Sequence, residues 1–381
     1  MASPFSRPVP VHLLATHHGF HADEVAAIVL CWAYPEKSDP MFPGISDANV
    51  TFVDAGRKTH LGGSADEAFV TSTGIMYVGC GKSPWDEHPD GKEALEPDGT
   101  KKPRKCAFSL VVETFDLQNN KEIQALNRYL VRVDGTATDT KRSLATVIKT
   151  LHNNRAMKLE VVKKWVEEKN PEAYSRILTL LLKRQTLEDD FGWAADAVLA
   201  KMGESEQTDD FTVDKIGELM RLQNPELAAQ WLEVATDALE LDQLLFDNVT
   251  RPDYFASSTI VELLGRSRGK PQKIKIAFVA SDDVRVHKFA RTIEGGRVAV
   301  LVQRRTNGSV AIMTNLWAGV NVRDVARVLM RMEALRRGLK PPRWDEAKQE
   351  MTFSVWFHFE TGKALFNGTN TTIEVEPTKL N

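Results

Sequence analysis

The chain has 381 residues, of which 42 % are hydrophobic and 27 % are charged, and its formal net charge is −3. This composition suits a globular protein of two or three domains and excludes the collagen-like, intrinsically disordered and disulfide-rich classes. The balanced charge excludes a strongly basic surface over the whole protein, although a local basic groove stays compatible with it.

The spacing of the cysteines and the length of the apolar runs indicate the cellular compartment and whether the protein crosses a membrane. Cys31, Cys80 and Cys106 are odd in number and widely spaced, so they predict reduced thiols rather than disulfides or a zinc finger. The first ten residues hold no apolar run of signal-peptide length, and no stretch of about eighteen apolar residues occurs anywhere. We therefore expect a cytoplasmic protein without a membrane partner.

The first elements in chain order have the pattern of a doubly wound α/β domain. Residues 10–16 read as a short buried strand, 17–23 as a polar loop and 24–32 as an apolar helix. Strand, loop and helix in this order predict a doubly wound, mostly parallel sheet. Ligands of such sheets bind at the carboxyl ends of the strands, where this polar loop would lie.

Two more strands and two helices complete this predicted domain. Residues 48–57 form a strand that reaches Asp54, and residues 74–82 form another that leads into a loop holding Asp86, Glu87 and His88. Helices are predicted over 106–115 and 120–135.

The rest of the chain divides into a segment with helical spacing of apolar residues and a segment with predicted strands. Helical spacing of apolar residues predicts a helical segment from about 141 onward. Strands are then expected at 273–281, 297–305 and 309–317, with a hairpin at Thr306-Asn307-Gly308, followed by a helix over 322–338. The predicted domains are a doubly wound α/β domain (1–140), a helical insertion or linker (141–257) and a smaller α+β domain (258–381).

A candidate metal site lies in the first polar loop. His17, His21 and Asp23 have the spacing H-x3-H-x-D after a strand, and imidazole and carboxylate suit Mn²⁺, Fe²⁺ or Zn²⁺. Asp54 follows the second strand and could bridge two ions about 3.5–4 Å apart. Since oxygen donors prevail, we expect Mn²⁺, with Zn²⁺, Fe²⁺ and Mg²⁺ as alternatives.

These residues carry a resemblance to the DHH phosphoesterase superfamily. Its first motif is a histidine with acidic residues four and six positions on, and His17, His21 and Asp23 occupy those positions, with His21 in place of the first carboxylate. THHGFHADEV is most similar to the MYG-type (melanocyte-proliferating-gene) branch, with one residue fewer between the histidines. Asp54 in FVDAGR matches the lone aspartate of the second motif.

The third and fourth motifs of the superfamily are also represented. WDEHP stands where DHH is expected, so Asp86 and His88 match the outer letters and Glu87 replaces the middle histidine, which is normally a ligand. Asp134 is the choice for the fourth motif, and Asp139 is the alternative. The resemblance implies metal ligation by these residues: His17, His21, Asp23, Asp54, Asp86, Glu87 and Asp134.

The resemblance implies a two-metal hydrolase of phosphodiesters or phosphoanhydrides. RNA ends, short oligonucleotides and nucleotides are the expected substrates, and MYG-type members are associated with 3′-to-5′ RNA exonuclease activity. His88 would orient the phosphate or protonate the leaving oxygen, beside the bridging Asp54. The C-terminal domain would supply specificity, and a homodimer is compatible with the sequence.

Substrate contacts are expected from four further side chains. His18, Arg57 and His60 lie in or after the metal loops, and Arg305 precedes the Asn-Gly turn. Each also has an ordinary interpretation as a solvated loop or hairpin residue.

Two other functions stay open at this stage. Loss of one ligand at Glu87 would leave a degenerate DHH-like protein that binds nucleotide or RNA without turnover. Alternatively, the helical segment would be the binding surface of an assembly factor.

Overall fold

The computed structural model describes most of the chain, and it contains two compact units. The described residues are 9–53, 64–87, 105–136, 139–155, 167, 170–183, 186–204, 208–267, 270–315, 318–341, 356–358 and 364–367. The first unit is formed by residues 1–89, 93–158 and 178–242, and the second by 90–92, 159–177 and 243–381.

A parallel sheet of three strands lies in the first unit, in the order β2 (Asn49–Val53), β1 (Leu13–His17) and β3 (Ile75–Tyr77). Both neighbours run parallel to β1, with His17 beside Val53 and Ala15 beside Tyr77. Because β3 joins the other side of β1, the chain reverses its direction across the sheet after β2. The three predicted strands are therefore present among the described residues.

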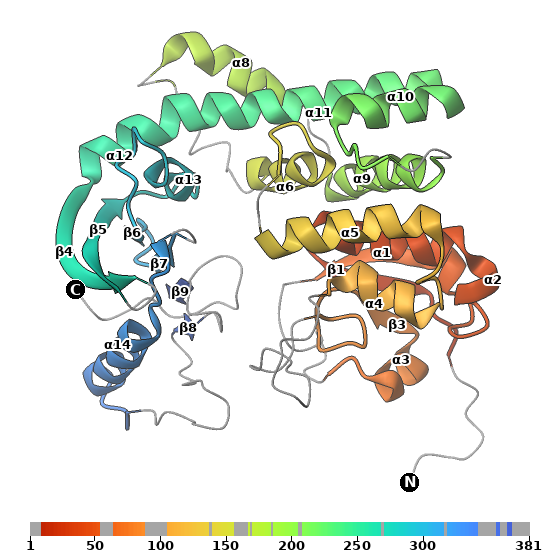
Figure 1. Cartoon of the computed structure of the whole chain (residues 1–381), viewed down its shortest axis with the longest axis horizontal. Coiled ribbons are helices and arrows are strands. Elements are labelled where there is room, and N and C mark those ends of the chain that lie inside the picture. The colour runs from red at the N-terminus through yellow and green to blue at the C-terminus, as the bar shows by residue number, and fades with distance from the viewer. Residues whose placement is uncertain are drawn as a thin grey trace. The chain divides into compact units, whose positions relative to one another are not determined.

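Helices surround this sheet and supply most of the core of the first unit (Figure 1). They are α1 (Ala22–Ala33), α2 (Pro35–Ser38), α3 (Glu67–Thr73), α4 (Ala107–Thr114), α5 (Lys121–Thr136), α6 (Leu144–Arg155), α9 (Leu187–Met202) and α10 (Val213–Gln223). Two further helices, α8 (Pro171–Leu182) and α11 (Pro225–Leu245), have residues in both units.

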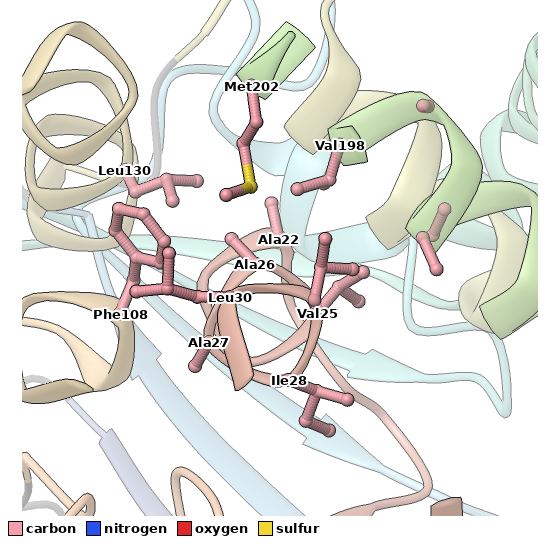
Figure 2. Packing of buried hydrophobic residues seen from close by; sticks show 14 of the residues in the cluster. Ala22, Val25, Ala26, Ala27, Ile28, Leu30, Phe108, Leu130, Val198 and Met202 are labelled. Carbon is pink, nitrogen blue, oxygen red and sulfur yellow. The ribbon is translucent and has the colours of Figure 1, made fainter. Parts of the chain in front are cut away.

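The helix α1 is the centre of this core. All of its residues from Ala22 to Cys31 are buried, which explains why its sequence is apolar on every face. Figure 2 shows Met202 and Val198 of α9 directed at Ala22 and Ala26 on one side of α1. Truncating a buried side chain such as Met202 to alanine would cost about 2–5 kcal/mol.

The other side of α1 is covered by the two helices that follow the sheet. In Figure 2, Phe108 of α4 packs against Leu30, and Leu130 of α5 lies beside Phe108. The helix α1 is thus held between α4 and α5 on one side and α9 on the other, and its first turn has a fixed position.

The second unit contains a mixed sheet with the order β4-β5-β6-β7-β9-β8. Its strands are β4 (Thr259–Ser267), β5 (Lys270–Ala280), β6 (Val300–Arg304), β7 (Val310–Thr314), β8 (Phe357–His358) and β9 (Ala364–Asn367). Its helices are α12 (Arg251–Ser257), which follows a π-helical turn at Phe246–Thr250, α13 (Val286–Ala290) and α14 (Arg323–Arg336).

The hairpin predicted from Thr306-Asn307-Gly308 is confirmed, because β6 and β7 pair antiparallel around it and Gly308 has a φ of 82°. The strand β4, which pairs along its whole length with β5, was not predicted. Its consecutive residues Leu263 and Leu264 are both exposed, so β4 lacks the alternation of a half-buried strand. The chain is thus a mixed α/β protein. Among the described residues, no helix combines the length and apolar character needed to cross a membrane.

Candidate metal centre

The loop between β1 and α1 places two histidines at the carboxyl end of the central strand. His17 is the last residue of β1, and His21 immediately precedes the first residue of α1. Their rings lie edge to face, with centroids 5.4 Å apart and an interplanar angle of 79°. The His17 side chain is 13 % exposed and that of His21 is 53 % exposed, so solvent reaches the pair from the side of His21.

Glu24 fixes both histidines from the first turn of α1. Its carboxylate accepts a hydrogen bond from the backbone N–H of His21 at 2.5 Å, which satisfies one of the free donors at the start of the helix. Its Oε1 lies 2.9 Å from Nε2 of His17, and the Glu24 side chain is only 1 % exposed. A carboxylate that holds an imidazole in this way orients the ring for ligation through its other nitrogen.

Gly79 packs against Glu24 from the loop after β3. Its φ is 68°, and a Cβ at this position would lie 2.6 Å from Oε1 of Glu24. Glycine is therefore required twice, by the left-handed backbone and by the close carboxylate.

Asp23 connects the loop to α4. It is 3 % exposed, and its Oδ2 accepts a hydrogen bond from the backbone N–H of Ala107 at 3.1 Å. Ala107 is the first residue of α4, and a carboxylate is stabilised at the amino end of a helix.

Two overlapping groups of potential ligands result. His17, His21 and Glu24 form one group, and His21, Asp23 and Asp134 form the other, with the ligand atoms of each within 4.8 Å of one another. Asp134 reaches the site from α5. Since the groups share His21, they form one continuous cluster drawn from β1, α1 and α5.

The electrostatics of the cluster are those of crowded, buried carboxylates. Burial raises the pKa of Asp23 well above its usual value, and the charges of Glu24 and Asp134 raise it further. Burial also opposes ionisation of Glu24, but the charges and hydrogen bonds of His17 and His21 outweigh it and lower the pKa of Glu24 to about 2.

Glu87 reaches the same environment from the loop after β3. Trp85, which is fully buried, anchors this loop by donating from Nε1 to Thr114 at 3.0 Å and by accepting from the N–H of Gly79. Burial raises the pKa of Glu87 to about 10, together with the negative charges of Asp23, Glu24 and Asp134. Glu87 is therefore electrostatically coupled to the cluster, although it belongs to neither ligand group.

The other predicted site residues divide into those outside the cluster and those not described. His18 is exposed and stacks on Phe52, and Asp86 accepts from the backbone N–H of Lys82. Asp139 accepts from the hydroxyl of Tyr129 at 2.6 Å, so the structure groups Asp134 rather than Asp139 with His21 and Asp23. Asp54, Arg57, His60 and His88 lie outside the described residues.

Glu24 was missed as a potential ligand by sequence reasoning. An acidic residue in the first helical turn is explained by the helix dipole alone, so Glu24 does not stand out as a ligand from its position. The signal for its second role was the adjacent histidine motif. Glu24 lies about one helical turn after His21, so its side chain can reach back to that residue.

The donor set fits a divalent cation. Imidazole nitrogens and carboxylate oxygens suit Mn²⁺, Fe²⁺ or Zn²⁺, and a cation would compensate carboxylates that burial brings together. Two ligand atoms about 2.1 Å from one ion are at most about 4.2 Å apart. Ligand atoms that lie within 4.8 Å of one another therefore need at most a small contraction to converge on one ion.

Comparisons with known proteins give no family assignment. No family model matches the chain, and no curated protein matches it. A crystal structure of an uncharacterized protein from Helicobacter pylori G27 is 12 % identical, covers 84 % of this chain and 89 % of that chain, and superimposes with a TM-score of 0.24. A TM-score this low supports no conclusion about fold or function.

Proposed function

We propose that the protein is a divalent-metal-dependent phosphoesterase, similar to the DHH superfamily and to its MYG-type branch. The observation that carries the proposal is the pair of ligand groups that share His21 at the carboxyl end of the central parallel strand. In open α/β sheets this edge, beside the point where the strand order reverses, is where ligands bind.

The proposal includes the finer architecture expected from the sequence. The three-stranded sheet would be the centre of a doubly wound domain over 1–140, followed by a helical segment (141–257) and a substrate-recognition domain (258–381). Expected substrates are phosphodiesters or phosphoanhydrides of RNA ends, short oligonucleotides or nucleotides.

The residues of the cluster would have different roles in binding the metal and the substrate. His17, His21, Asp23 and Asp134 would hold the metal, and Glu24 would orient His17 or bind in its own right. When bound, divalent cations neutralise phosphoryl charge and make an attacking water more acidic. The exposed edge of His21 is the side from which substrate would enter.

The number of ions depends on residues beyond the described part. A neutral imidazole has one lone pair, so His21 can ligate one ion at a time, and the two described groups provide for a single ion. A second ion would need Asp54 as the bridging ligand, and His88 would serve the phosphate or the leaving oxygen, as the sequence suggests.

This sharing of His21 favours one alternative function, a DHH-like protein that binds nucleotide or RNA around one ion without turnover. The alternative predicts nucleotide binding that survives in a protein with one bound metal and no hydrolysis. Manganese titration followed by metal analysis distinguishes the two, because hydrolysis by the proposed mechanism requires two ions per chain.

The test is metal content together with hydrolysis of bis-p-nitrophenyl phosphate and of short RNA with Mn²⁺. His21→Ala removes a donor from both groups, so we expect its activity to fall by at least about 10²-fold. Asp134→Asn should lose activity as well, whereas Asp139→Asn should keep it, because Asp139 is bound to Tyr129. Full activity in His21→Ala would reject the proposal.

A further inference from the structure

The helix α14 of the second unit carries apolar residues on two opposite sides. One side is buried, where Ala326 and Met330 belong to the apolar core that α14 shares with the mixed sheet. Four apolar residues on the other side are between 43 % and 65 % exposed: Val325, Val328, Met332 and Leu335. We call them the exposed stripe of α14. The solvent side of a helix in a globular protein is normally polar, so a second apolar side indicates a contact surface.

The spacing of the exposed stripe is that of a coiled-coil seam. Its residues follow one another at intervals of three, four and three positions, which are the a and d positions of two successive heptads. At about 3.6 residues per turn they lie within about 80° of the helix circumference, almost opposite Ala326 and Met330. Such a stripe is narrower than the apolar face with which a helix packs on a globular core. The surface therefore has the form that receives one further helix along its length.

Two arginines border the exposed stripe, one on each side. Arg331 precedes an a position and Arg336 follows a d position, so they occupy the g and e positions of these heptads. Both are exposed, and neither takes part in an ion pair among the described residues. The exposed Asp324, by contrast, is compensated by Arg327 at 3.3 Å. The edges of the stripe thus carry positive charge at the positions through which coiled-coil helices select their partners.

These charges distinguish among three occupants of the stripe. A second copy of α14 would bring arginine against arginine in parallel as well as in antiparallel pairing, which is repulsive. An anionic membrane would match the charge, but helices that lie in a bilayer surface present a broad apolar face with aromatic residues, whereas the stripe is narrow and contains none. Acidic residues at the e and g positions of a different helix would pair with Arg331 and Arg336 while its apolar residues cover the stripe.

We propose that the exposed stripe of α14 binds an acidic amphipathic helix of a partner protein. The apolar side chains of the partner helix pack on the stripe, and its carboxylates lie opposite Arg331 and Arg336. Because the stripe supplies four apolar side chains and two exposed charges, the affinity is modest and decreases with ionic strength. The inference stands on residues of the second unit and is independent of the metal centre and of the proposed hydrolysis.

The experiment uses the full chain and a fluorescein-labelled peptide of about four heptads, with leucine at a and d and glutamate at e and g. The glutamates prevent the peptide from pairing with itself. Fluorescence anisotropy should show saturable binding at about micromolar protein concentrations, and added salt should weaken it. The same peptide with lysine at e and g should bind at least about tenfold more weakly, because lysine and arginine repel each other.

Variants of exposed residues test the stripe and its borders separately. Met332→Gln and Leu335→Gln should each weaken binding of the acidic peptide by about tenfold. Arg331→Gln should weaken it by about two- to fivefold and reduce its salt dependence. Leu222→Gln and Arg221→Gln, near the end of α10, replace an exposed leucine and an exposed arginine outside the stripe and should bind like the wild type. Circular dichroism establishes that each variant is folded.

Three results would overturn the proposal. The first is wild-type protein that does not bind the acidic peptide, or that binds it equally well after Met332→Gln and Leu335→Gln. The second is sedimentation with vesicles of phosphatidylserine and phosphatidylcholine that Met332→Gln abolishes, because it would assign the stripe to a membrane. The third is a wild-type dimer in analytical ultracentrifugation that Leu335→Gln converts to a monomer, because the stripe would then join two copies of the chain.

Discussion

Both units contain buried charge, and they stabilise it differently. In the first unit, Asp23 and Glu24 are buried side by side and are held by donors from neighbouring helices and by histidine rings. In the second unit, Arg285 and Glu333 are buried, and each contacts an oppositely charged side chain, Asp283 at 3.3 Å and Arg337 at 2.7 Å. The acidic cluster of the first unit therefore calls for a cation, whereas the buried charges of the second unit compensate one another.

The largest effect on this contrast is expected when the negative charge of Glu24 is removed from the acidic cluster. Glu24→Gln keeps the size of the side chain and loses the negative charge that faces His17 and His21. We expect Mn²⁺ affinity to fall by about 10- to 100-fold, measured by electron paramagnetic resonance titration. Glu36→Gln, an exposed glutamate of α2, is the control. Unchanged affinity in Glu24→Gln would show that Glu24 is only a helix-capping residue.

A smaller effect is expected from the glycine that packs on Glu24. Gly79→Ala combines a left-handed backbone with a Cβ 2.6 Å from the carboxylate, and should destabilise the protein by about 1–3 kcal/mol. Gly19→Ala is a matched comparison in the other loop, because its Cβ would make an ordinary contact at 3.6 Å from His17. Chemical denaturation measures both, and equal stability of the two variants would contradict the close packing.

The half-buried His287 of α13 predicts a pH dependence of the second unit. Burial lowers the pKa of His287 to about 3, below its unfolded value of 6.5, so only the unfolded state takes up a proton between these pH values. Stability is therefore complete above pH about 6.5 and decreases as the pH falls, by up to about 2 kcal/mol at pH 5. Hydrogen exchange in β6 and β7 at pH 7 and pH 5 measures this loss. His287→Gln should reduce the dependence, and an unchanged slope would assign it to other groups.

Sequence patterns located the first loop of the site because its histidines follow a recognisable strand. They could not choose between Asp134 and Asp139, since that choice depends on where α5 ends. The helix continues to Thr136, which places Asp134 on the helix and leaves Asp139 beyond it, in contact with Tyr129. Glu24 was not recognised as a potential ligand, because an acidic residue is common at the start of a helix for electrostatic reasons alone.

The second unit was less accessible to sequence reasoning for a different physical reason. The Asn-Gly turn predicted the β6–β7 hairpin because turn chemistry is local. His287, Arg291 and Asn315 line one small hollow because the fold brings them together, and no spacing in the sequence marks them as neighbours. Arg305 was singled out from its place before the turn, whereas its acidic neighbours Asp282 and Asp283 emerged only from the fold.

The position of His21 has a consequence for how this centre can evolve. Its backbone N–H serves α1, while its ring serves the ligand groups, so one substitution can alter the ring's chemistry without displacing the helix. Aspartate is among the residues most favoured at the residue before a helix and is also a harder ligand than imidazole. Exchange between histidine and aspartate at residue 21 therefore offers lineages a single mutational step that changes metal preference and preserves the scaffold.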